Sequence, residues 1–470
     1  MKKVLRFIVL AAALTFVCCT EKDTTIGDDQ EQTSPEDDNE DAESFWDDIE
    51  GPITGDAFPD PVFRAYVFDN FDIDKDGKIS EEEAFNVKRI AVSDRGIKSF
   101  AGLEYFPELS DLYCGSNQLT SLDVTKNPEL ESLYCYSNQL TSLDVSKSPK
   151  LVHLECYSNQ LTSLDVSKNP NLEYLSCYSN QLTSLDVSKN PELESLSCYS
   201  NQLTSLDVSK NPNLEYLSCH SNQLTSLDVS KNPELIYLFC FSNQLTSLVS
   251  MNPKLEYLDC HSNQLTSLDV SKNPELIYLY CESNQLTSLV SMNPKLRELF
   301  CSSNQLTSLD VSMNPELREL FCESNQLTSL DVSMNPKLWY LYCSSNQLTS
   351  LDVSMNPNLI RLSCESNQLT SLDVSKNPEL SELYCYSNQL TSLDVTKNPN
   401  LSMLLCYSNQ LTSLDVSKTD LANSPDTYPL NCSMLSLQTL TLKRWWRIEG
   451  INVNRSTDYI PSHTEILYVD

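Results

Sequence analysis

The segment from residue 72 to residue 83 carries oxygen-bearing groups at alternate positions up to residue 80 and again at its last residue. These are Asp72, Asp74, Asp76, the backbone carbonyl of Lys78, Ser80 and Glu83. Calcium prefers six to eight hard oxygen ligands, and a twelve-residue loop supplies them from positions 1, 3, 5, 7, 9 and 12, with glycine at position 6. Gly77 occupies that sixth position. We therefore predict one bound calcium ion, the alternative being an acidic turn that binds no metal.

Helices on both sides must hold such a loop in place. Apolar residues at helical spacing predict one helix from Pro59 to Phe71, and an acidic start predicts a second from Ser80 to Ile90. Ile79, at position 8 of the loop, should anchor it to the core. This arrangement resembles an EF-hand. Because only one such loop is present and extracellular calcium is millimolar, we expect a structural ion rather than a switch.

The first residues have the pattern of an export signal. Positive charge precedes an apolar run from Phe7 to Val17, which is too short to span a bilayer. The run ends at Cys18 and Cys19 and resembles the lipobox of bacterial lipoproteins, which implies lipidation of Cys19, or alternatively of Cys18. We expect residues 1–19 to be a lipoprotein signal peptide, with a plain secretory peptide as the alternative. The membrane contact would then be through this lipid anchor alone.

Residues 20–56 are strongly acidic and nearly devoid of aliphatic side chains, which predicts a disordered tether. Acidic residues directly after the lipid cysteine resemble a surface-export signal of Gram-negative lipoproteins, which implies a position on the outer membrane facing outward. The formal net charge of the chain is −33. Such a charge repels phosphate backbones, so we expect no binding to nucleic acid.

From Leu109 onward the chain repeats a 21-residue unit that contains one cysteine. The repeated cysteines are Cys114, Cys135, Cys156, Cys177, Cys198, Cys219, Cys240, Cys260, Cys281, Cys301, Cys322, Cys343, Cys364, Cys385 and Cys406. Strand alternation points Leu112 and Cys114 inward on a short strand, and Asn117 can bond the backbone at the bend that follows. The cysteines should therefore form a buried structural ladder rather than disulfides.

The unit Leu112 to Leu119 has the frame of a leucine-rich repeat, with cysteine where leucine is usual. It resembles the internalins, in particular those with 21-residue repeats and a cysteine ladder. The resemblance implies a repeat solenoid, a curved rod with a parallel β-sheet on its concave face, and adhesion to a host surface or matrix. We expect an EF-hand-like helical cap at residues 57–90, the repeat array at 91–421 and a β-rich C-terminal cap at 422–470.

Among the variable residues of the repeats are those beside the inward leucine and cysteine, which should face the concave side. Many of these residues are aromatic, a composition typical of protein interfaces. The predicted ligand-binding stripe contains Tyr237, Phe239, Phe241, Tyr257, Tyr278, Tyr280, Phe300, Phe321, Tyr340 and Tyr342. We predict a protein ligand on this face. A glycan ligand, and a passive spacer whose rings only stack on each other, are the alternatives.

Two further regions have simpler interpretations. The aspartate of each repeat and the lysine or methionine after it should form a solvated outer face with local ion pairs. Trp445 and Trp446 should cover the last turn of the array, while Cys432 lies outside the repeats and has no assigned role.

The sequence does not predict an enzyme. His153, His220 and His261 fall in separate repeats and could not converge on one metal or nucleophile, and there is no glycine-rich phosphate loop. We therefore expect a monomeric, non-catalytic binding protein.

Overall fold

The computed structural model describes residues 53–421, 429–443, 460–461 and 463–469. These residues belong to one compact unit that starts at residue 52. Three short helices come first: η1 (Gly55–Ala57), α3 (Pro61–Phe71) and α4 (Glu81–Phe85). A further short helix, η2 (Leu103–Tyr105), follows the first strand. No helix among the described residues is both long and apolar enough to cross a membrane.

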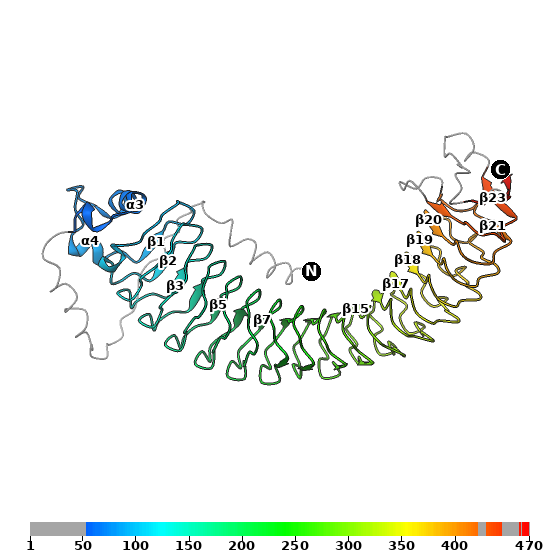
Figure 1. Ribbon diagram of the computed structural model, residues 1–470, viewed down its shortest axis with the longest axis horizontal. Helices are drawn as coiled ribbons and strands as arrows, with labels where there is room; N and C mark the ends of the chain where they lie inside the picture. The colour runs from blue at the N-terminus through cyan, green and yellow to red at the C-terminus, as the bar shows by residue number, and fades with distance from the viewer. Residues whose placement is uncertain (1–52, 422–428, 444–459, 462, 470) are drawn as a thin grey trace, which may run out of the picture. The chain divides into compact units, whose positions relative to one another are not determined.

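The repeats stack into a leucine-rich-repeat solenoid whose strands lie on the concave side of the array (Figure 1). Each main-sheet strand has three residues, except for the two-residue β22, and pairs in parallel with the equivalent residues of the next repeat, as Leu279 does with Leu299. The main sheet has 17 strands. They are β1 (Arg89–Ala91), β2 (Asp111–Tyr113), β3 (Ser132–Tyr134), β4 (His153–Glu155), β5 (Tyr174–Ser176), β6 (Ser195–Ser197), β7 (Tyr216–Ser218), β9 (Tyr237–Phe239), β11 (Tyr257–Asp259), β13 (Tyr278–Tyr280), β15 (Glu298–Phe300), β16 (Glu319–Phe321), β17 (Tyr340–Tyr342), β18 (Arg361–Ser363), β19 (Glu382–Tyr384), β20 (Met403–Leu405) and β22 (Leu430–Asn431).

Smaller sheets form in the second half of some repeats. They contain β8 (Ser226–Asp228) with β10 (Ser247–Val249), β12 (Ser267–Asp269) with β14 (Ser288–Val290), and β21 (Ser413–Asp415) with β23 (Thr439–Lys443) and β24 (Glu465–Val469). The last of these sheets forms the C-terminal β cap, in which Leu440 pairs with Leu414 on one side and Ile466 on the other.

The core is one continuous column of leucine, cysteine and valine side chains. The middle residue of each main-sheet strand from Leu112 to Leu404 is buried, and all fifteen repeat cysteines are fully buried and free. The cysteine ladder is therefore confirmed. Each thiol acts as a small apolar group in the core.

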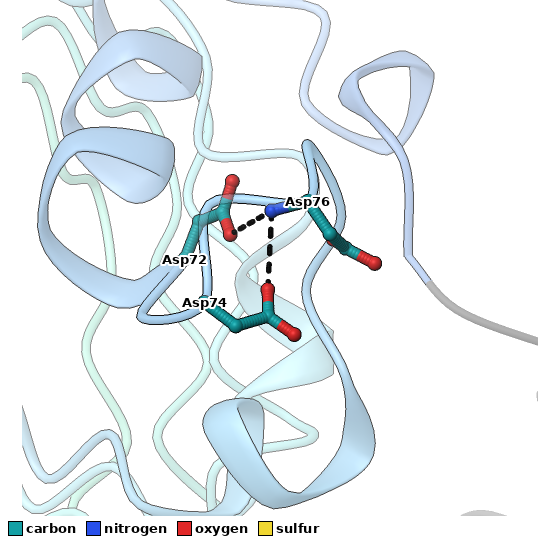
Figure 2. Close-up of side chains that lie close together, drawn as sticks. All are labelled: Asp72, Asp74 and Asp76. Carbon is teal, nitrogen blue, oxygen red and sulfur yellow. Dashed lines mark hydrogen bonds between the residues drawn. The ribbon is translucent and has the colours of Figure 1, made fainter.

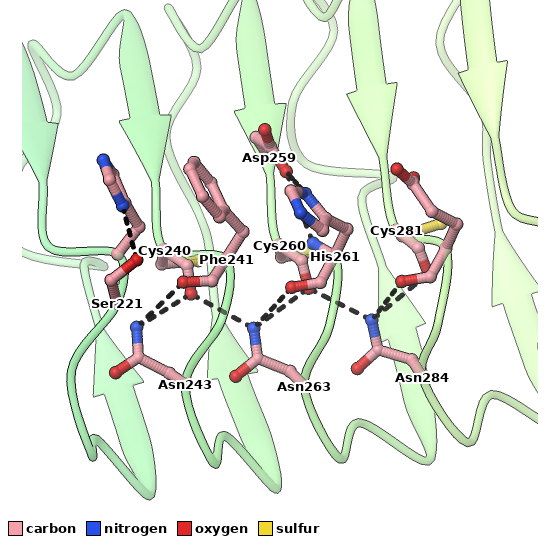
Figure 3. Close-up of polar contacts among 12 residues, drawn as sticks. Ser221, Cys240, Phe241, Asn243, Asp259, Cys260, His261, Asn263, Cys281 and Asn284 are labelled. Atoms are coloured by element: carbon pink, nitrogen blue, oxygen red, sulfur yellow. Dashed lines mark hydrogen bonds and ion pairs between the residues drawn. The ribbon is translucent and has the colours of Figure 1, made fainter.

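A serine and an asparagine turn the chain after each cysteine. The serine two residues after the cysteine has a left-handed backbone, as at Ser262 with φ of 52°. Asn263 then donates its amide hydrogens to the carbonyls of Cys240 and Cys260, both at 3.1 Å (Figure 3). It also accepts from the Leu245 N–H at 2.9 Å. The same bonds recur along the array, so the predicted role of this asparagine is confirmed.

A second buried asparagine row, which we did not predict, follows the valine of each repeat. Asn169 donates to the carbonyls of Val145 and Ser148 at 3.0 and 2.8 Å, while its own Oδ1 is buried without a hydrogen-bond partner. Two repeats, Cys240 to Cys260 and Cys281 to Cys301, are one residue shorter than the others. In the first of them a buried serine, Ser250, takes the place of valine and donates to Oδ1 of Asn252 at 3.0 Å. The shorter unit is thus accommodated by a new hydrogen bond.

The N-terminal cap differs from the predicted helices and boundaries. The first helix begins at Pro61 because Asp60 caps it, accepting from Val62 and Phe63. The second helix ends at Phe85, well before the predicted Ile90, because Arg89–Ala91 forms strand β1 of the main sheet. Ile53, which we assigned to the tether, already pairs with Ile79 of the loop.

The C-terminal end also continues the repeat further than predicted. Strand β22 pairs with β20, and the Cys406 N–H donates to the Asn431 carbonyl at 2.9 Å. Cys432 is fully buried, so it is one more member of the cysteine ladder. The described part of the predicted cap therefore begins as a degenerate repeat. Trp445 and Trp446 lie outside the described residues.

The outer face has ion pairs, but not between the predicted residues. Each aspartate instead accepts from the backbone N–H two residues later, as Asp165 does from Ser167 at 2.9 Å. The lysines that form ion pairs there lie just before the first leucine of a repeat and contact the equivalent glutamate of the preceding repeat, as Lys150 contacts Glu129. The pairing therefore links neighbouring repeats.

Candidate functional site

The acidic loop joins α3 to α4 and brings three of the six predicted ligands together. Asp72, Asp74 and Asp76 each place a carboxylate oxygen so that the three oxygens lie within 4.8 Å of one another, at the surface of the cap (Figure 2). Backbone N–H groups of the loop hold them: that of Asp76 donates to Asp72 and Asp74, both at 3.1 Å, and that of Gly77 to Asp72 at 3.0 Å. Such a cluster suits a hard divalent cation.

Glu83 and Ser80 lie outside this triad and pair with each other. The Glu83 carboxylate accepts from the N–H of Ile73 at 2.7 Å and from that of Ser80 at 2.8 Å, and the Ser80 hydroxyl caps α4. Although burial opposes its ionisation, hydrogen bonds from Ser80, Ile73 and Asp74 hold the pKa of Glu83 below its usual range. Glu83 is therefore an anion tied to the start of the loop. The Lys78 N–H donates to Asp76 at 2.8 Å.

The centre of the loop is held by a short antiparallel contact. Ile53 and Ile79 exchange both backbone hydrogen bonds, at 3.0 and 2.8 Å, and the Ile79 side chain is fully buried. Ile79 thus anchors the loop to the core, as we predicted. The backbone at Ile53 therefore forms the antiparallel bridge to this loop.

The concave sheet presents three parallel columns of side chains. We call the first residue of each strand column 1, the third residue column 2 and the residue after each ladder cysteine column 3. The residues of these columns are mostly half-buried, because they stand side by side on adjacent strands. The ten predicted ligand-binding residues fall into all three columns, so they do not form one stripe.

In column 3 seven rings stack face to face without interruption. They are Tyr136, Tyr157, Tyr178, Tyr199, His220, Phe241 and His261, with neighbouring ring centroids 4.0–4.8 Å apart and planes within 15°. Phe241 was predicted as part of the ligand stripe, whereas the other six were not. Their recurrence every 20 or 21 residues after a cysteine was the signal that could have identified the stack.

The rings of columns 1 and 2 form a second, less regular cluster. The ring centroid of Tyr257, in column 1, lies 4.9 Å from that of Phe239 and 5.3 Å from that of Tyr280, both in column 2. These contacts therefore cross between the columns. Tyr280, Phe300, Phe321 and Tyr342 then follow column 2 with centroids 4.1–4.7 Å apart. Tyr278 and Tyr340 are half-buried members of column 1. Tyr237, also in column 1, is an exception, because only 7% of its surface is exposed.

Carboxylates interrupt the rings and are partly desolvated. Burial raises the pKa of Glu155 to about 7 and raises the pKa values of Glu282 and Glu323 above their ordinary range. Asp259 pairs with His261 at 2.6 Å, and this hydrogen bond raises the pKa of the imidazole (Figure 3). The concave face is therefore both aromatic and acidic.

The remaining positions singled out in the sequence are three histidines and the two candidate lipidation cysteines. His153 stacks on Tyr174, while His220 and His261 belong to the column 3 stack, so these three do not converge on one point. Cys18 and Cys19 lie outside the described residues.

Comparisons with known proteins agree with this architecture. The family model for "Leucine Rich repeats (2 copies)" matches residues 149–190, 170–211 and 191–232. A comparison with curated proteins gives no match. YopM from Yersinia enterocolitica is 29% identical with a TM-score of 0.55, over 77% of this chain and 78% of its own. A leucine-rich-repeat protein of Leptospira interrogans is 26% identical with a TM-score of 0.60, over 70% of this chain and 92% of its own.

The functional domain of InlJ from Listeria monocytogenes, described as including a cysteine ladder, is 35% identical to this chain. The TM-score is 0.66, and the match covers 84% of this chain and 82% of InlJ. Both proteins thus share the solenoid fold and a cysteine ladder. The chain belongs to the internalin-type leucine-rich-repeat proteins with a cysteine ladder, which are not enzymes.

Proposed function

We propose that the chain is a surface adhesin that binds a protein ligand, on a host cell or in a matrix, through its concave face. The observation that carries this proposal is that columns 1, 2 and 3 all vary from repeat to repeat, in addition to the residue before each strand, the residue after each proline and the lysine or methionine of the outer half. The leucines, cysteines and asparagines behind them are almost invariant from repeat to repeat. Diversity on a half-exposed aromatic face, above an unchanging core, is the expected pattern of a binding surface.

The ring geometry favours a protein ligand over a glycan. Sugars bind aromatic side chains by stacking on a free ring face, but both faces of Tyr157, Tyr178 and Tyr199 are covered by neighbouring rings. What these columns offer outward are ring edges, hydroxyls and carboxylates, which suit the mixed polar and apolar surface of a protein.

The test is binding of the purified chain, in calcium, to arrays of host-surface, matrix and mucin proteins and to glycan arrays. A variant with Tyr278→Ala, Tyr280→Ala and Tyr342→Ala should lose the binding. The matched control is Met313→Ala, Met334→Ala and Met355→Ala, which removes three side chains that are 56–57% exposed in the outer half of the repeats. Circular dichroism would verify that both variants are folded.

Binding to a protein that the tyrosine variant loses and the methionine variant keeps would support the proposal. Binding to glycans alone would replace it with a role in glycan capture. Absence of any binding would leave the solenoid as a spacer, whereas equal loss in both variants would contradict binding through the concave tyrosines.

We also propose that the loop holds one calcium ion and that a lipid at Cys19, or at Cys18, anchors the chain to the outer membrane facing outward. The aspartate triad supports the first proposal, and the apolar run that ends at these cysteines supports the second. Metabolic labelling with a fatty acid, in cells expressing Cys18→Ala or Cys19→Ala, tests the anchor. Label that persists in both single variants and in the double variant would rule it out.

A further inference from the structure

Column 3 changes from rings to carboxylates in the second half of the array. After His261, its next five residues are Glu282, Ser302, Glu323, Ser344 and Glu365. The carboxylates thus occur in every second repeat, with a small hydroxyl side chain between them. Ser302 donates a hydrogen bond to Glu323, and Ser363 donates to Glu365 at 2.7 Å.

These three carboxylates form no ion pair among the described residues, and His261, the preceding residue of column 3, is a basic side chain that lowers the pKa of Glu282. None of them takes part in any of the ion pairs found there. Glu282 has one carboxylate oxygen, Oε2, that is buried without a hydrogen-bond partner. Burial raises the pKa values of Glu282 and Glu323, and the neighbouring carboxylates of column 3 add to each shift. Partial burial of like charges without a counter-ion costs free energy, and a bound cationic group would reduce that cost.

The neighbouring columns leave this row available to a ligand. Column 2 beside it consists of Tyr280, Phe300, Phe321 and Tyr342, which are half-buried and expose part of each ring. Arg361 is the one arginine or lysine of column 1 between β13 and β18, and it is engaged by Glu382 and by the Tyr342 hydroxyl. The sheet face here therefore combines an aromatic row with a parallel acidic row.

The spacing of the carboxylates in column 3 matches one backbone conformation of a peptide ligand better than another. Parallel strands lie about 4.8 Å apart, so carboxylates in every second repeat are about 9.6 Å apart. A polyproline II helix repeats every three residues, or about 9.3 Å. Same-face residues of an extended strand are about 6.7 or 13.4 Å apart, which does not match. Polyproline II segments also dock on aromatic side chains, since they expose proline rings and lose little entropy on binding.

We propose that the concave face over β13 to β18 binds a polyproline II segment that carries a basic residue at every third position. Its basic side chains pair with Glu282, Glu323 and Glu365, and its remaining residues pack on Phe300 and Phe321. This inference rests on the proposed function and specifies the chemistry of the protein partner.

The test uses three synthetic peptides and isothermal titration calorimetry at 0.15 M salt. The first peptide is (Pro-Pro-Lys)5, the second has the same composition with its five lysines in one block, and the third is (Pro-Pro-Glu)5. We expect the first to bind, the second to bind at least several-fold more weakly, and the third not to bind. The variant Glu282→Gln, Glu323→Gln, Glu365→Gln should weaken the first peptide roughly tenfold, since three partly exposed ion pairs are lost.

The matched control is Glu234→Gln, Glu275→Gln, Glu316→Gln. It makes the same change in net charge at glutamates that pair with lysines away from the concave face. This control should bind (Pro-Pro-Lys)5 like the unmodified chain. Equal binding of the first two peptides, or equal weakening in both glutamine variants, would overturn the inference, because net charge alone would then explain the binding.

The two proposals can fail separately. If a protein ligand from the arrays is lost with the tyrosine variant but unaffected by Glu282→Gln, Glu323→Gln, Glu365→Gln, the adhesin proposal stands and the polyproline inference is wrong. If the chain binds (Pro-Pro-Lys)5 as expected but no array protein, the site exists and the adhesin proposal fails.

Discussion

At the scale of single residues, each turn of the solenoid depends on a serine and the asparagine after it. Ser262 has a left-handed backbone, a conformation that is unfavourable for residues other than glycine. Asn263 offsets this by satisfying three backbone groups that the turn removes from the sheet pattern. The polar side chain is buried because backbone donors and acceptors must be paired inside the core.

Replacing Asn263 with alanine should lower the free energy of unfolding by roughly 2–4 kcal/mol, because buried backbone groups lose their partners. Chemical denaturation followed by circular dichroism measures the change. The matched control is Gln264→Ala, which removes the neighbouring, exposed amide and should change the stability by less than about 0.5 kcal/mol. Similar losses in both variants would contradict the assigned role.

Two histidines of the column 3 stack should have pKa values on opposite sides of the ordinary value for an imidazole. The hydrogen bond to Asp259 raises the pKa of His261, whereas burial lowers the pKa of His220 to about 4. NMR titration of the imidazole protons measures both, and Asp259→Asn should lower the pKa of His261. An unchanged pKa in that variant would show that Asp259 is not the cause.

The same shifts predict opposite effects of pH on stability. His261, with its raised pKa, stabilises the fold below pH 6.5, and this contribution is lost as the pH rises through its folded pKa. His220, with its lowered pKa, favours the fold above pH 6.5 and costs stability as the pH falls toward about 4. Replacing His220 with glutamine should therefore reduce the loss of stability between pH 6.5 and 4. An unchanged loss would contradict this.

At the scale of elements, the N-terminal cap is a small helical unit that covers the first strand of the sheet. Phe58, Phe63 and Phe106 are fully buried within it, and the Lys98 N–H donates to Asp60 at 2.8 Å. The acidic loop is joined to this unit through Ile79. An ion bound by the aspartates would therefore stabilise the cap and the start of the array together.

Calcium should raise the unfolding temperature of the chain, because a ligand that binds only the folded state stabilises it. Asp72→Asn with Asp74→Asn should abolish the increase. The matched control is Glu81→Gln with Glu82→Gln, which removes two charges from exposed residues of α4 that are not predicted ligands. Differential scanning calorimetry with millimolar calcium or with chelator provides the measurement. A calcium effect that survives in the aspartate variant would place the ion elsewhere.

At the scale of the whole molecule, the array is stabilised by contacts between neighbouring repeats. Each main-sheet strand pairs with the strands of adjacent repeats, and ion pairs such as Lys337 with Glu316 join one repeat to the next. In such a solenoid the stability is approximately a sum of repeat and interface contributions. A local defect should therefore act locally.

Leu299→Ala removes a fully buried side chain in the middle of the array and should cost about 2–5 kcal/mol. Hydrogen–deuterium exchange should show the largest loss of protection in the flanking repeats and little change at either end. Leu435→Ala, at a side chain that is 95% exposed, is the control and should leave the exchange pattern unchanged. A uniform loss of protection along the array would mean that the solenoid unfolds as one unit.

The sequence alone determined the repeat, the inward leucine and cysteine, the bonding of Asn117 and its equivalents, and the outward position of the variable residues. This was possible because each repeat packs against a near-copy of itself, so the period and the strand alternation already specify the neighbours. The anchoring role of Ile79 followed in the same way from its place within a loop of known spacing.

Only the tertiary structure decided which outward residues contact each other. Ring packing buries Tyr237 and brings Phe239 against Tyr257 of another column, because these contacts depend on side-chain conformations across strands rather than on spacing. Cys432 enters the ladder although its repeat is degenerate, since backbone pairing with β20 positions it. The sequence shows that glutamates occur in every second repeat of column 3 between Glu282 and Glu365. Their partial burial and their lack of ion-pair partners in the described part of the chain arise from the stacking of the repeats.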